Sequence, residues 1–189
     1  WFYVRAWGLR VTDLMQGPVY GIFTDENEVD DRLLPAFAYD EVFGTVVNRF
    51  VVQAVAGYPL TVYGQGGQTR GYLNLKDTLQ CLLLAAQHPA DEGELKIYNQ
   101  LTETFSVNEL AANVERVGNQ MGLNVEIKSI ENPRKELEDH YYNPTHTGLL
   151  ELGLEPHFLT DESLAQIIEK VVAHKEHIVS DRIFRGVKW

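Results

Sequence analysis

The chain has 189 residues, of which 44% are hydrophobic and 23% are charged, which is the composition of an ordinary globular protein with a core of its own. Its formal net charge of −11 excludes nucleic acids and anionic membranes as partners held by general electrostatic attraction, so a phosphate ligand would need local positive charge. The one cysteine, Cys81, lies in an apolar run and is expected to be a buried structural thiol in a reducing compartment. No apolar run reaches the roughly 20 residues of a membrane span, and no signal-peptide pattern opens the chain.

The first residues predict the end of a helix followed by a strand. Trp1 to Trp7 is rich in aromatic residues and runs into Gly8, a natural helix C-cap. These aromatics need a covering surface, so we expect an exposed apolar patch where that surface is missing. Residues 9–14 then alternate apolar and polar, and a loop with glycine and proline follows. Helix, strand and loop in this order are typical of an α/β fold with a parallel sheet.

Residues 24–40 predict a solvated excursion or flap. They contain the acidic run TDENEVDD and few periodic apolar residues. A calcium site is the alternative, but the glycine and ligand spacing of an EF-hand loop is absent.

The rest of the chain predicts alternating helices and strands, with no internal repeat and no linker, so residues 1–189 are treated as one unit. We expect Asp77 to be the N-cap of the helix at residues 77–88, and Ser106 and Glu109 to form a capping box at the start of the helix at residues 106–122. The predicted helices are 41–56, 77–88, 106–122, 147–152 and 160–177, and the predicted strands are 60–63, 71–75, 94–101 and 124–130.

The segment LTVYGQGGQTRGYLNLKD, residues 60–77, carries the sharpest functional signal. Two β-like runs flank a glycine-rich loop, and Arg70 stands where the loop re-enters a strand. A guanidinium on a rigid strand edge is suited to a bidentate grip on phosphate oxygens. The alternative is a β-hairpin with an incidental arginine, because the pattern is not a P-loop.

A second arginine, Arg134, follows Pro133 at the end of a predicted strand, and with Arg70 it could converge on a diphosphate. Other chemistry is weakly indicated. His174 and His177 could share a helix face, but no zinc-binding spacing accompanies them, so no metal is expected. No nucleophile-elbow motif is present either.

Several segments resemble one known family. AWGLRVTDLMQGPVYG, DEVFGTVVNRFVVQAVAGYPLTVYGQGGQTRGYLNLKDTLQC, IYNQLTETFSVNELA and NPRKELEDHYYNPTHTGLLELGLEPH are similar to the carboxyl-terminal half of the extended short-chain dehydrogenase/reductase (NAD-dependent epimerase/dehydratase) family. Within it they are similar to the UDP-sulfoquinovose synthases of sulfolipid biosynthesis. The resemblance implies a Rossmann-like fold, comprising the last parallel strands and a small substrate-binding α/β subdomain. It also implies a cytoplasmic location, or a plastid stroma or cyanobacterial cytoplasm.

The resemblance also implies ligands and site residues. The family uses NAD and adds sulfite to UDP-glucose. By analogy Gln16 faces the glucose and, with Val19, the nicotinamide, while Arg70 and Arg134 hold the diphosphate. The expected nucleotide-end residues are Gln68 with Tyr141 or Tyr142, and the expected flap residues closing over the sugar are Thr24, Asp25 and Glu26.

Two family motifs are expected to be absent, the glycine-rich NAD-binding turn and the Tyr-x-x-x-Lys pair of the catalytic acid/base, because both would lie before the matched segments. The one Tyr-x-x-x-Lys spacing in the sequence, Tyr72 to Lys76, falls inside RGYLNLKD, which is part of the match to the carboxyl-terminal half. The expectation is therefore a UDP-sugar-binding half whose amino-terminal NAD-binding half is absent, which is catalytically incomplete and does not hold NAD alone. Two alternatives stay open. One is a remnant that acts as an interaction module and forms a homodimer through its aromatic helix, and the other is a half-enzyme completed in trans by an NAD-binding partner.

Overall fold

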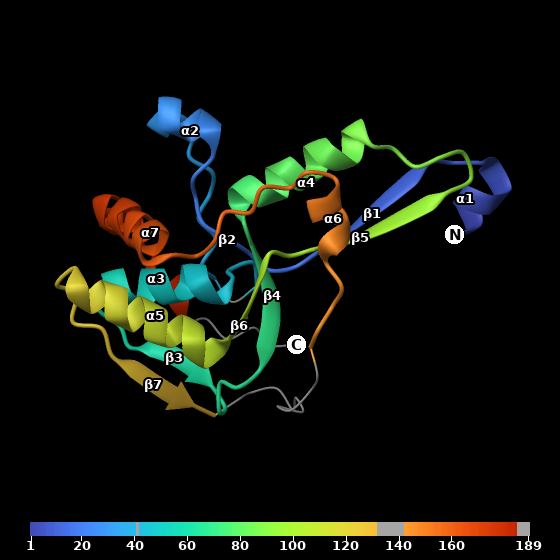
Figure 1. Ribbon diagram of the computed structural model, residues 1–189. Coiled ribbons are helices and arrows are strands. Elements are labelled where there is room, and N and C mark those ends of the chain that lie inside the picture. The colour runs from blue at the N-terminus through green and yellow to red at the C-terminus, as the bar shows by residue number, and fades with distance from the viewer. Residues whose placement is uncertain (41, 132–141, 185–189) are drawn as a thin grey trace.

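The computed structural model describes residues 1–40, 42–131 and 142–184, which form an α/β fold (Figure 1). The strands are β1 (Val11–Gln16), β2 (Val19–Tyr20), β3 (Leu60–Tyr63), β4 (Thr69–Asn74), β5 (Leu95–Gln100), β6 (Glu103–Ser106) and β7 (Ile127–Ile130). The helices are α1 (Phe2–Trp7), α2 (Asp25–Val29), α3 (Val46–Ala56), α4 (Leu75–Gln87), α5 (Val107–Gln120), α6 (Thr147–Glu151), α7 (Asp161–Ala173) and α8 (Ser180–Ile183), with 3-10 turns η1 (Asp31–Leu33) and η2 (Lys175–His177).

The strands pair mostly in parallel, which confirms the parallel-sheet prediction. β1 runs parallel to β5, β2 to β4, and β3 to β7, whereas β4 and β6 are antiparallel. The hairpin alternative for residues 60–75 is wrong, because β3 and β4 take different partners on the two sides of the glycine-rich loop. This loop therefore crosses from one small sheet to another.

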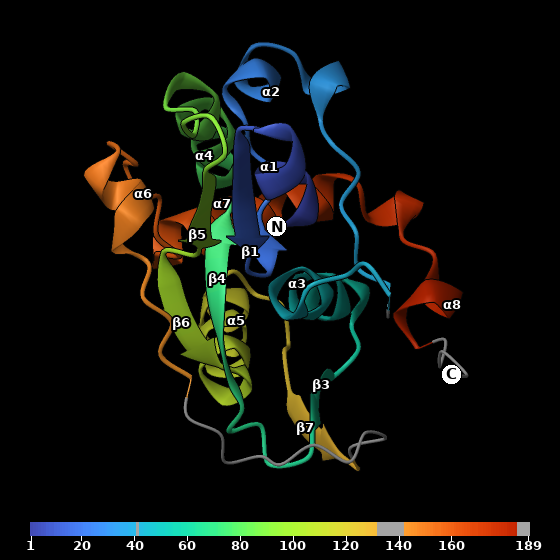
Figure 2. The ribbon, with the colours of Figure 1, turned by 90° about the vertical axis from the view of Figure 1, so that its right-hand side faces the viewer.

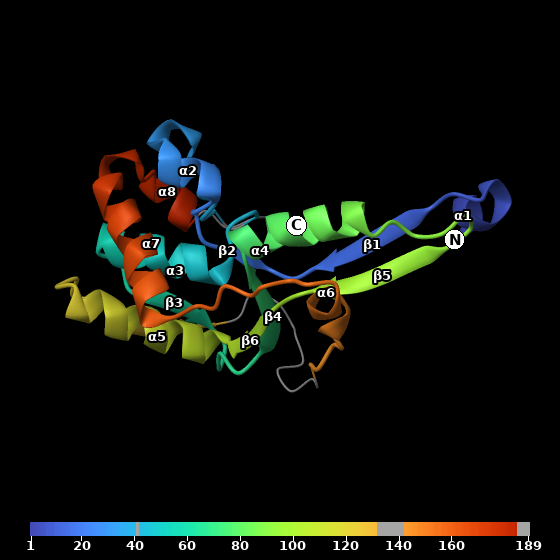
Figure 3. The ribbon, with the colours of Figure 1, turned by 45° about the horizontal axis from the view of Figure 1, so that its top comes forward.

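The main core lies among α3, α5 and α7, which pack together beside β3 and β7 (Figure 2). Each helix buries a stripe of aliphatic side chains, such as Val51, Leu110 and Ile168. Burial of this apolar surface supplies most of the stability of the cluster, at roughly 25 cal/mol per Å². The paired strands β1 and β5 extend away from these helices toward α1, with α4 alongside (Figure 3).

Two helix starts differ from the prediction. α3 begins at Val46, because the Asp40 carboxylate accepts hydrogen bonds from the backbone N–H groups of Val42 and Phe43 and forms a turn there. The expected start, residue 41, lies outside the described residues. α4 begins two residues before Asp77, and its N-cap is Asn74, whose side chain accepts from the Lys76 N–H. Asp77 is instead fully buried and bonded elsewhere.

Other boundaries move by a few residues. The first strand starts at Val11 and continues through Gln16, and the last starts at Ile127. The final predicted helix ends at Ala173, and the turn η2 follows it. The capping box of Ser106 and Glu109 is confirmed, with the Ser106 N–H donating to Glu109 Oε2 at 2.7 Å.

The aromatic amino-terminal helix is confirmed. α1 ends at Gly8, whose φ of 62° is the left-handed conformation that glycine adopts at little cost. Trp1, Phe2, Tyr3 and Trp7 are all exposed, and together they form the expected apolar patch.

The flap, defined here as residues 22–37, leaves the body at Gly21 and returns at Ala38. It carries α2 and η1. One buried side chain holds both of its roots, because Asn48 Oδ1 accepts from the Gly21 N–H at 3.3 Å and Asn48 Nδ2 donates to the Ala38 carbonyl at 3.4 Å. The flap is therefore anchored to α3 at both ends.

Candidate functional site

The glycine-rich loop between β3 and β4 has a fixed shape. Gly64 and Gly66 have φ angles of 64° and 71°, which other residues rarely adopt. Asn108, at the start of α5, holds the loop by donating from its backbone N–H to the Gly66 carbonyl at 3.0 Å and from Nδ2 to the Gln65 carbonyl at 2.7 Å. The loop consequently delivers Arg70 to a defined place at the start of β4.

Arg70 is half-buried, and Tyr72 lies close enough to feel its charge. Its Nη1 donates to the Thr69 carbonyl at 2.9 Å. Burial raises the pKa of the neighbouring Tyr72 to about 12; the Arg70 charge lowers it, and Tyr142 raises it. The Tyr142 hydroxyl is so close to β4 that a Cβ atom added to Gly71 would lie 3.0 Å from it. Arg70 and Tyr142, both predicted to bind the nucleotide, thus lie along the same stretch of β4.

A third group of polar atoms lies at the start of α3. Thr45 is the N-cap residue, and Arg49 follows one turn later on the same face. Arg49 lies over the ring of Tyr63, 5.6 Å from its centroid, which places the guanidinium next to the point where β3 enters the glycine-rich loop.

Three buried polar atoms of this region have no hydrogen-bond partner among the residues that the structure describes. They are Thr45 Oγ1, Arg49 Nε and Gln68 Oε1. Leaving a buried polar atom unpaired costs about 1–3 kcal/mol, so proteins normally satisfy such groups. A bound polar molecule that pairs with them would remove this cost.

Gln16 lines a hollow of about 520 Å³. Val19, Thr45, Asn48 and Leu75 are among its other walls. Thr45 lines the hollow and is also one of the polar residues at the start of α3.

The hollow is close to β4 because of a tight contact at the end of β1. The Gly17 N–H donates to the Gln100 carbonyl at 2.9 Å, and a Cβ atom on Gly17 would lie 2.7 Å from the Gly71 carbonyl oxygen. Only glycine allows these strands to approach so closely. Gln16 and Arg70, each next to one of these glycines, are thereby brought to the same part of the molecule.

The predicted flap residues are placed away from this hollow, and none of the three lines it. Thr24 is buried, and its hydroxyl caps α2 by accepting from the Asn27 N–H at 3.4 Å. Asp25 pairs with Lys76 at 3.1 Å, and Glu26 is exposed on α2. Their closure over a sugar stays a prediction.

Two predicted ligand residues, Arg134 and Tyr141, lie outside the described residues, so their part in the site also stays a prediction. Three residues of the site were not predicted at all, Thr45, Asn48 and Arg49. A signal was present in the sequence, since Asn48 and Arg49 interrupt an otherwise apolar helix.

Chemistry elsewhere in the described part of the chain is limited. Cys81 is fully buried, which confirms the prediction of a buried structural thiol, and burial raises the pKa of that thiol. His174, Glu176 and His177 offer ligand atoms within 4.8 Å of one another. The two histidines do lie together, with their rings stacked 5.7 Å apart, but they stand at the end of α7 and in η2 and not on one face of the predicted helix. No helix in the described ranges is long and apolar enough to cross a membrane.

The residues present fit only one end of NAD. Gln16 and Val19 line the hollow and could contact a nicotinamide ring. The sequence contains no glycine-rich turn of the kind that binds a dinucleotide pyrophosphate at the start of a helix. The chain thus has residues that could line a nicotinamide site, but it has no glycine-rich turn that would bind the pyrophosphate of NAD.

Comparison with known proteins identifies the family to which the chain is similar. Residues 1–99 match the NAD dependent epimerase/dehydratase family. The chain is 52% identical over 188 residues to the chloroplastic UDP-sulfoquinovose synthase of Spinacia oleracea and 48% identical over 174 residues to the UDP-sulfoquinovose synthase of Sulfolobus acidocaldarius. These matches cover 100% and 92% of this chain but 39% and 44% of the relatives, so the chain spans about two fifths of their length.

Solved structures show the same fold. The UDP-glucose 4-epimerase of Thermotoga maritima, solved with UDP-glucose, has a TM-score of 0.66 at 22% identity, with 93% of this chain and 49% of the epimerase covered. The dTDP-glucose 4,6-dehydratase of Streptomyces venezuelae, solved with NAD, has a TM-score of 0.64 at 19% identity, with 92% of this chain and 47% of the dehydratase covered. The fold is therefore that of about half of an epimerase or dehydratase of the short-chain dehydrogenase/reductase type, and the chain belongs to the NAD dependent epimerase/dehydratase family.

Proposed function

We propose that this chain is the UDP-sugar-binding part of a UDP-sulfoquinovose synthase-like enzyme, with UDP-glucose as its ligand. The observation that carries the proposal is the set of buried polar atoms on Thr45, Arg49 and Gln68 that have no partner among the described residues, together with Arg70 two positions after Gln68. Identity to the spinach and Sulfolobus enzymes supports the choice of sugar nucleotide.

The diphosphate is assigned to the start of α3 and to two arginines. The first N–H groups of a helix favour a negative charge, and α3 has no side-chain cap hydrogen bond from Thr45. The guanidiniums of Arg49 and Arg70 supply the local positive charge that a chain with a net charge of −11 otherwise lacks. Arg134 is proposed as a third cation at this site.

The two ends of the ligand are assigned to either side of the diphosphate. Gln68, Tyr142 and Tyr141 are proposed at the nucleotide end, and Gln16 at the sugar end in the 520 Å³ hollow. Thr24, Asp25 and Glu26 belong to the flap that would close over the sugar.

Reaction at the sugar requires more than this chain. NAD, when bound, supplies hydride transfer at the sugar ring. The residues of this chain bind and orient the UDP-sugar, whereas the Tyr-x-x-x-Lys pair that moves the proton in the family is assigned to the missing half, because the one such spacing here, Tyr72 to Lys76, places a buried tyrosine next to a lysine that pairs with Asp25. We therefore infer that the chain alone binds UDP-glucose without turning it over, and that addition of sulfite needs an NAD-binding half.

Isothermal titration calorimetry with UDP-glucose, UDP and uridine tests the binding proposal. UDP-glucose and UDP are expected to bind and uridine to bind far more weakly. Removing one charged hydrogen bond costs about 1.5–3 kcal/mol, so Arg49→Ala and Arg70→Ala should each weaken UDP binding by about tenfold or more. Arg10→Ala, an exposed arginine remote from this site, is the matched control. A folded chain that gives no heat at millimolar UDP, or equal affinity in all variants, would refute the proposal.

The exposed aromatics of α1 favour a second role, as an assembly surface. Trp1, Phe2, Tyr3 and Trp7 present their rings to solvent together. An NAD-binding half supplied in trans, or a second copy of the chain, could cover them. Size-exclusion chromatography of the chain alone separates these cases, since a dimer that Trp7→Ser disrupts indicates self-association. By analogy with the chloroplastic relative, the compartment proposed is a plastid stroma or the cytoplasm.

A further inference from the structure

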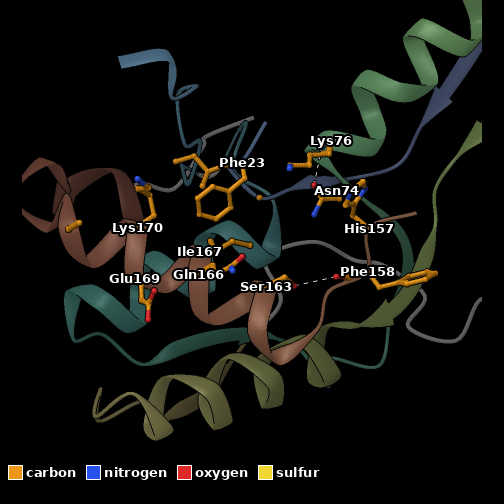
Figure 4. Close-up of a pocket in the computed structure, with 13 residues that line it drawn as sticks. Phe23, Asn74, Lys76, His157, Phe158, Ser163, Gln166, Ile167, Glu169 and Lys170 are labelled. Carbon is orange, nitrogen blue, oxygen red and sulfur yellow. Dashed lines mark hydrogen bonds between the residues drawn. The ribbon is translucent and has the colours of Figure 1, made fainter. Parts of the chain in front are cut away.

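A second hollow, of about 710 Å³, lies between the flap, the start of α4 and α7 (Figure 4). It shares only Gly21 with the hollow at Gln16, so the base of the flap separates the two. Nothing in the proposed UDP-sugar site uses it.

Two lysines of this hollow are held by carboxylates of the flap. Lys76 Nζ lies 3.1 Å from Asp25 Oδ1, and Lys170 Nζ lies 2.9 Å from Asp31 Oδ1. The lysine side chains are 22% and 21% exposed, whereas those of Asp25 and Asp31 are 90% and 70% exposed. The two lysines are thus part of the packed protein surface, whereas the flap carboxylates that pair with them are largely exposed to solvent.

The middle of the hollow is apolar. Phe23 and Ile167 line it, and Figure 4 shows Phe23 between Lys170 on one side and Lys76 on the other. The acidic residue of the lining, Glu169, points away from Phe23 in the same view. An apolar centre with a cation on each side is complementary to a hydrocarbon chain with two acidic ends.

A third polar group is oriented at the Lys76 side. The ring Nδ1 of His157 lies 2.7 Å from the buried carboxylate of Asp77, and this contact fixes the ring while about half of the side chain stays exposed to the hollow. Lys76 and His157 are 81 residues apart in the sequence and meet there (Figure 4).

We propose that this hollow binds a small organic dicarboxylate, whose two carboxylates pair with Lys76 and Lys170, the lysines that otherwise hold Asp25 and Asp31. Phe23 and Ile167 cover its hydrocarbon frame. The existing ion pairs show that both lysines accept a carboxylate in this geometry, and exposed ion pairs are worth only about 0–1 kcal/mol each, so a ligand can displace them.

Binding in this hollow changes the ion pairs of the flap. Asp25 and Asp31 are the flap carboxylates that hold α2 and η1 to the body, and the roots of the flap are fixed to Asn48, which also lines the hollow at Gln16. A ligand that displaces these carboxylates removes two ion pairs of the flap, whereas Phe23, which covers the ligand, and the buried Ile22 and Asn27 keep the flap on the body. The hollow is therefore a ligand site beside the flap and outside the UDP-sugar site.

Titration calorimetry on the 189-residue chain tests this with glutarate, adipate and suberate as probes, and with hexanoate and sulfate as comparison anions. We expect saturable binding of one of the dicarboxylates and weaker binding of hexanoate and sulfate. Asp25→Asn with Asp31→Asn removes the internal competitors and should tighten binding about five- to tenfold. Asp13→Asn with Asp91→Asn removes the same charge elsewhere on the surface and should leave the affinity nearly unchanged.

Removal of either lysine charge should have the opposite effect on the affinity for the dicarboxylate. Lys76→Met and Lys170→Met should each weaken dicarboxylate binding about tenfold, whereas Lys128→Met on exposed β7 should not. Equal affinity in the lysine and control variants, no gain from the flap substitutions, or sulfate binding as tight as that of the dicarboxylates would each overturn the proposal.

Discussion

The buried carboxylate of Asp77 holds His157, which is 80 residues further along the chain. Asp77 Oδ1 and Oδ2 accept the His157 backbone N–H at 3.1 and 3.0 Å, and Oδ1 lies 2.7 Å from the ring Nδ1. Two similar contacts flank this one. Gln80 Oε1 accepts from the Glu155 N–H, and Glu103 accepts from the Leu159 N–H at 3.0 Å.

Side chains thus accept the backbone hydrogen bonds of residues 155–159 as a neighbouring strand would. Their alternate N–H groups are bonded by Gln80, Asp77 and Glu103, and the Tyr20 hydroxyl donates to the His157 carbonyl at 3.2 Å. This strap, residues 155–159, leads directly into α7. It therefore joins α7, a wall of the dicarboxylate hollow, to α4 and β6.

Asp77 should give the stability a characteristic dependence on pH. Burial raises the pKa of its carboxyl in the folded protein, so the folded state binds a proton more readily than the unfolded state. Its contribution is then largest below the unfolded pKa of about 4 and is lost as the pH rises through the folded pKa. In Asp77→Asn this dependence disappears. Urea unfolding of both proteins at several pH values should show the wild type losing stability relative to Asp77→Asn as the pH rises above about 4. Parallel curves would contradict the assignment.

Removal of the Asp77 side chain should cost far more than its neutralisation. Asp77→Ala removes a fully buried side chain and leaves the His157 N–H without its acceptor, so the free energy of unfolding should fall by about 2–4 kcal/mol. Asp91→Ala, on an exposed loop, is the control and should change it by less than about 0.5 kcal/mol. Chemical denaturation monitored by tryptophan fluorescence measures both.

Tyr20 and Glu103 should be energetically coupled. The Tyr20 hydroxyl donates to Glu103 Oε1 at 2.7 Å, and burial raises the pKa of both groups. In a double-mutant cycle of Tyr20→Phe and Glu103→Gln, we expect a coupling free energy of about 1–3 kcal/mol, as for hydrogen bonds to charged groups. Strictly additive effects would show that the bond contributes nothing net.

Gly17 should not tolerate a side chain. A Cβ atom there would lie 2.7 Å from the Gly71 carbonyl oxygen, so Gly17→Ala should force β1 and β4 apart and destabilise the fold by about 1–3 kcal/mol. UDP binding should weaken as well, because this contact places Gln16 near Arg70. Gly67→Ala is the matched control, since a Cβ atom on Gly67 meets nothing within 4 Å, and it should be neutral or stabilising by up to about 1 kcal/mol. Thermal unfolding and calorimetry distinguish the two.

Cys81 should be unreactive in the folded chain. It is fully buried beside Leu73, Leu149 and Leu154, and burial raises the pKa of its thiol, so little thiolate forms near neutral pH. Ellman's reagent should label it slowly in buffer and completely in urea. Rapid labelling of the folded protein would show that this smaller core opens readily.

Much of the candidate site could be predicted from sequence because its signals are local. The glycines around Arg70 specify the loop, since positive φ angles at Gly64 and Gly66 are properties of single residues. Thr45 and Arg49 could not be predicted in the same way. Whether their polar atoms lack partners depends on what α3 packs against, and Tyr63 reaches Arg49 only in the folded chain.

The sequence by itself determined the helix ends at Gly8 and Gly57 and the capping box at Ser106, because each depends on interactions within a few residues. Tertiary structure decided that β3 pairs with β7 instead of β4. It also decided that Asp77 binds the strap instead of capping a helix. Both outcomes depend on which distant segments come together when the core forms, and hydrophobic packing selects those partners without leaving a pattern in the nearby sequence.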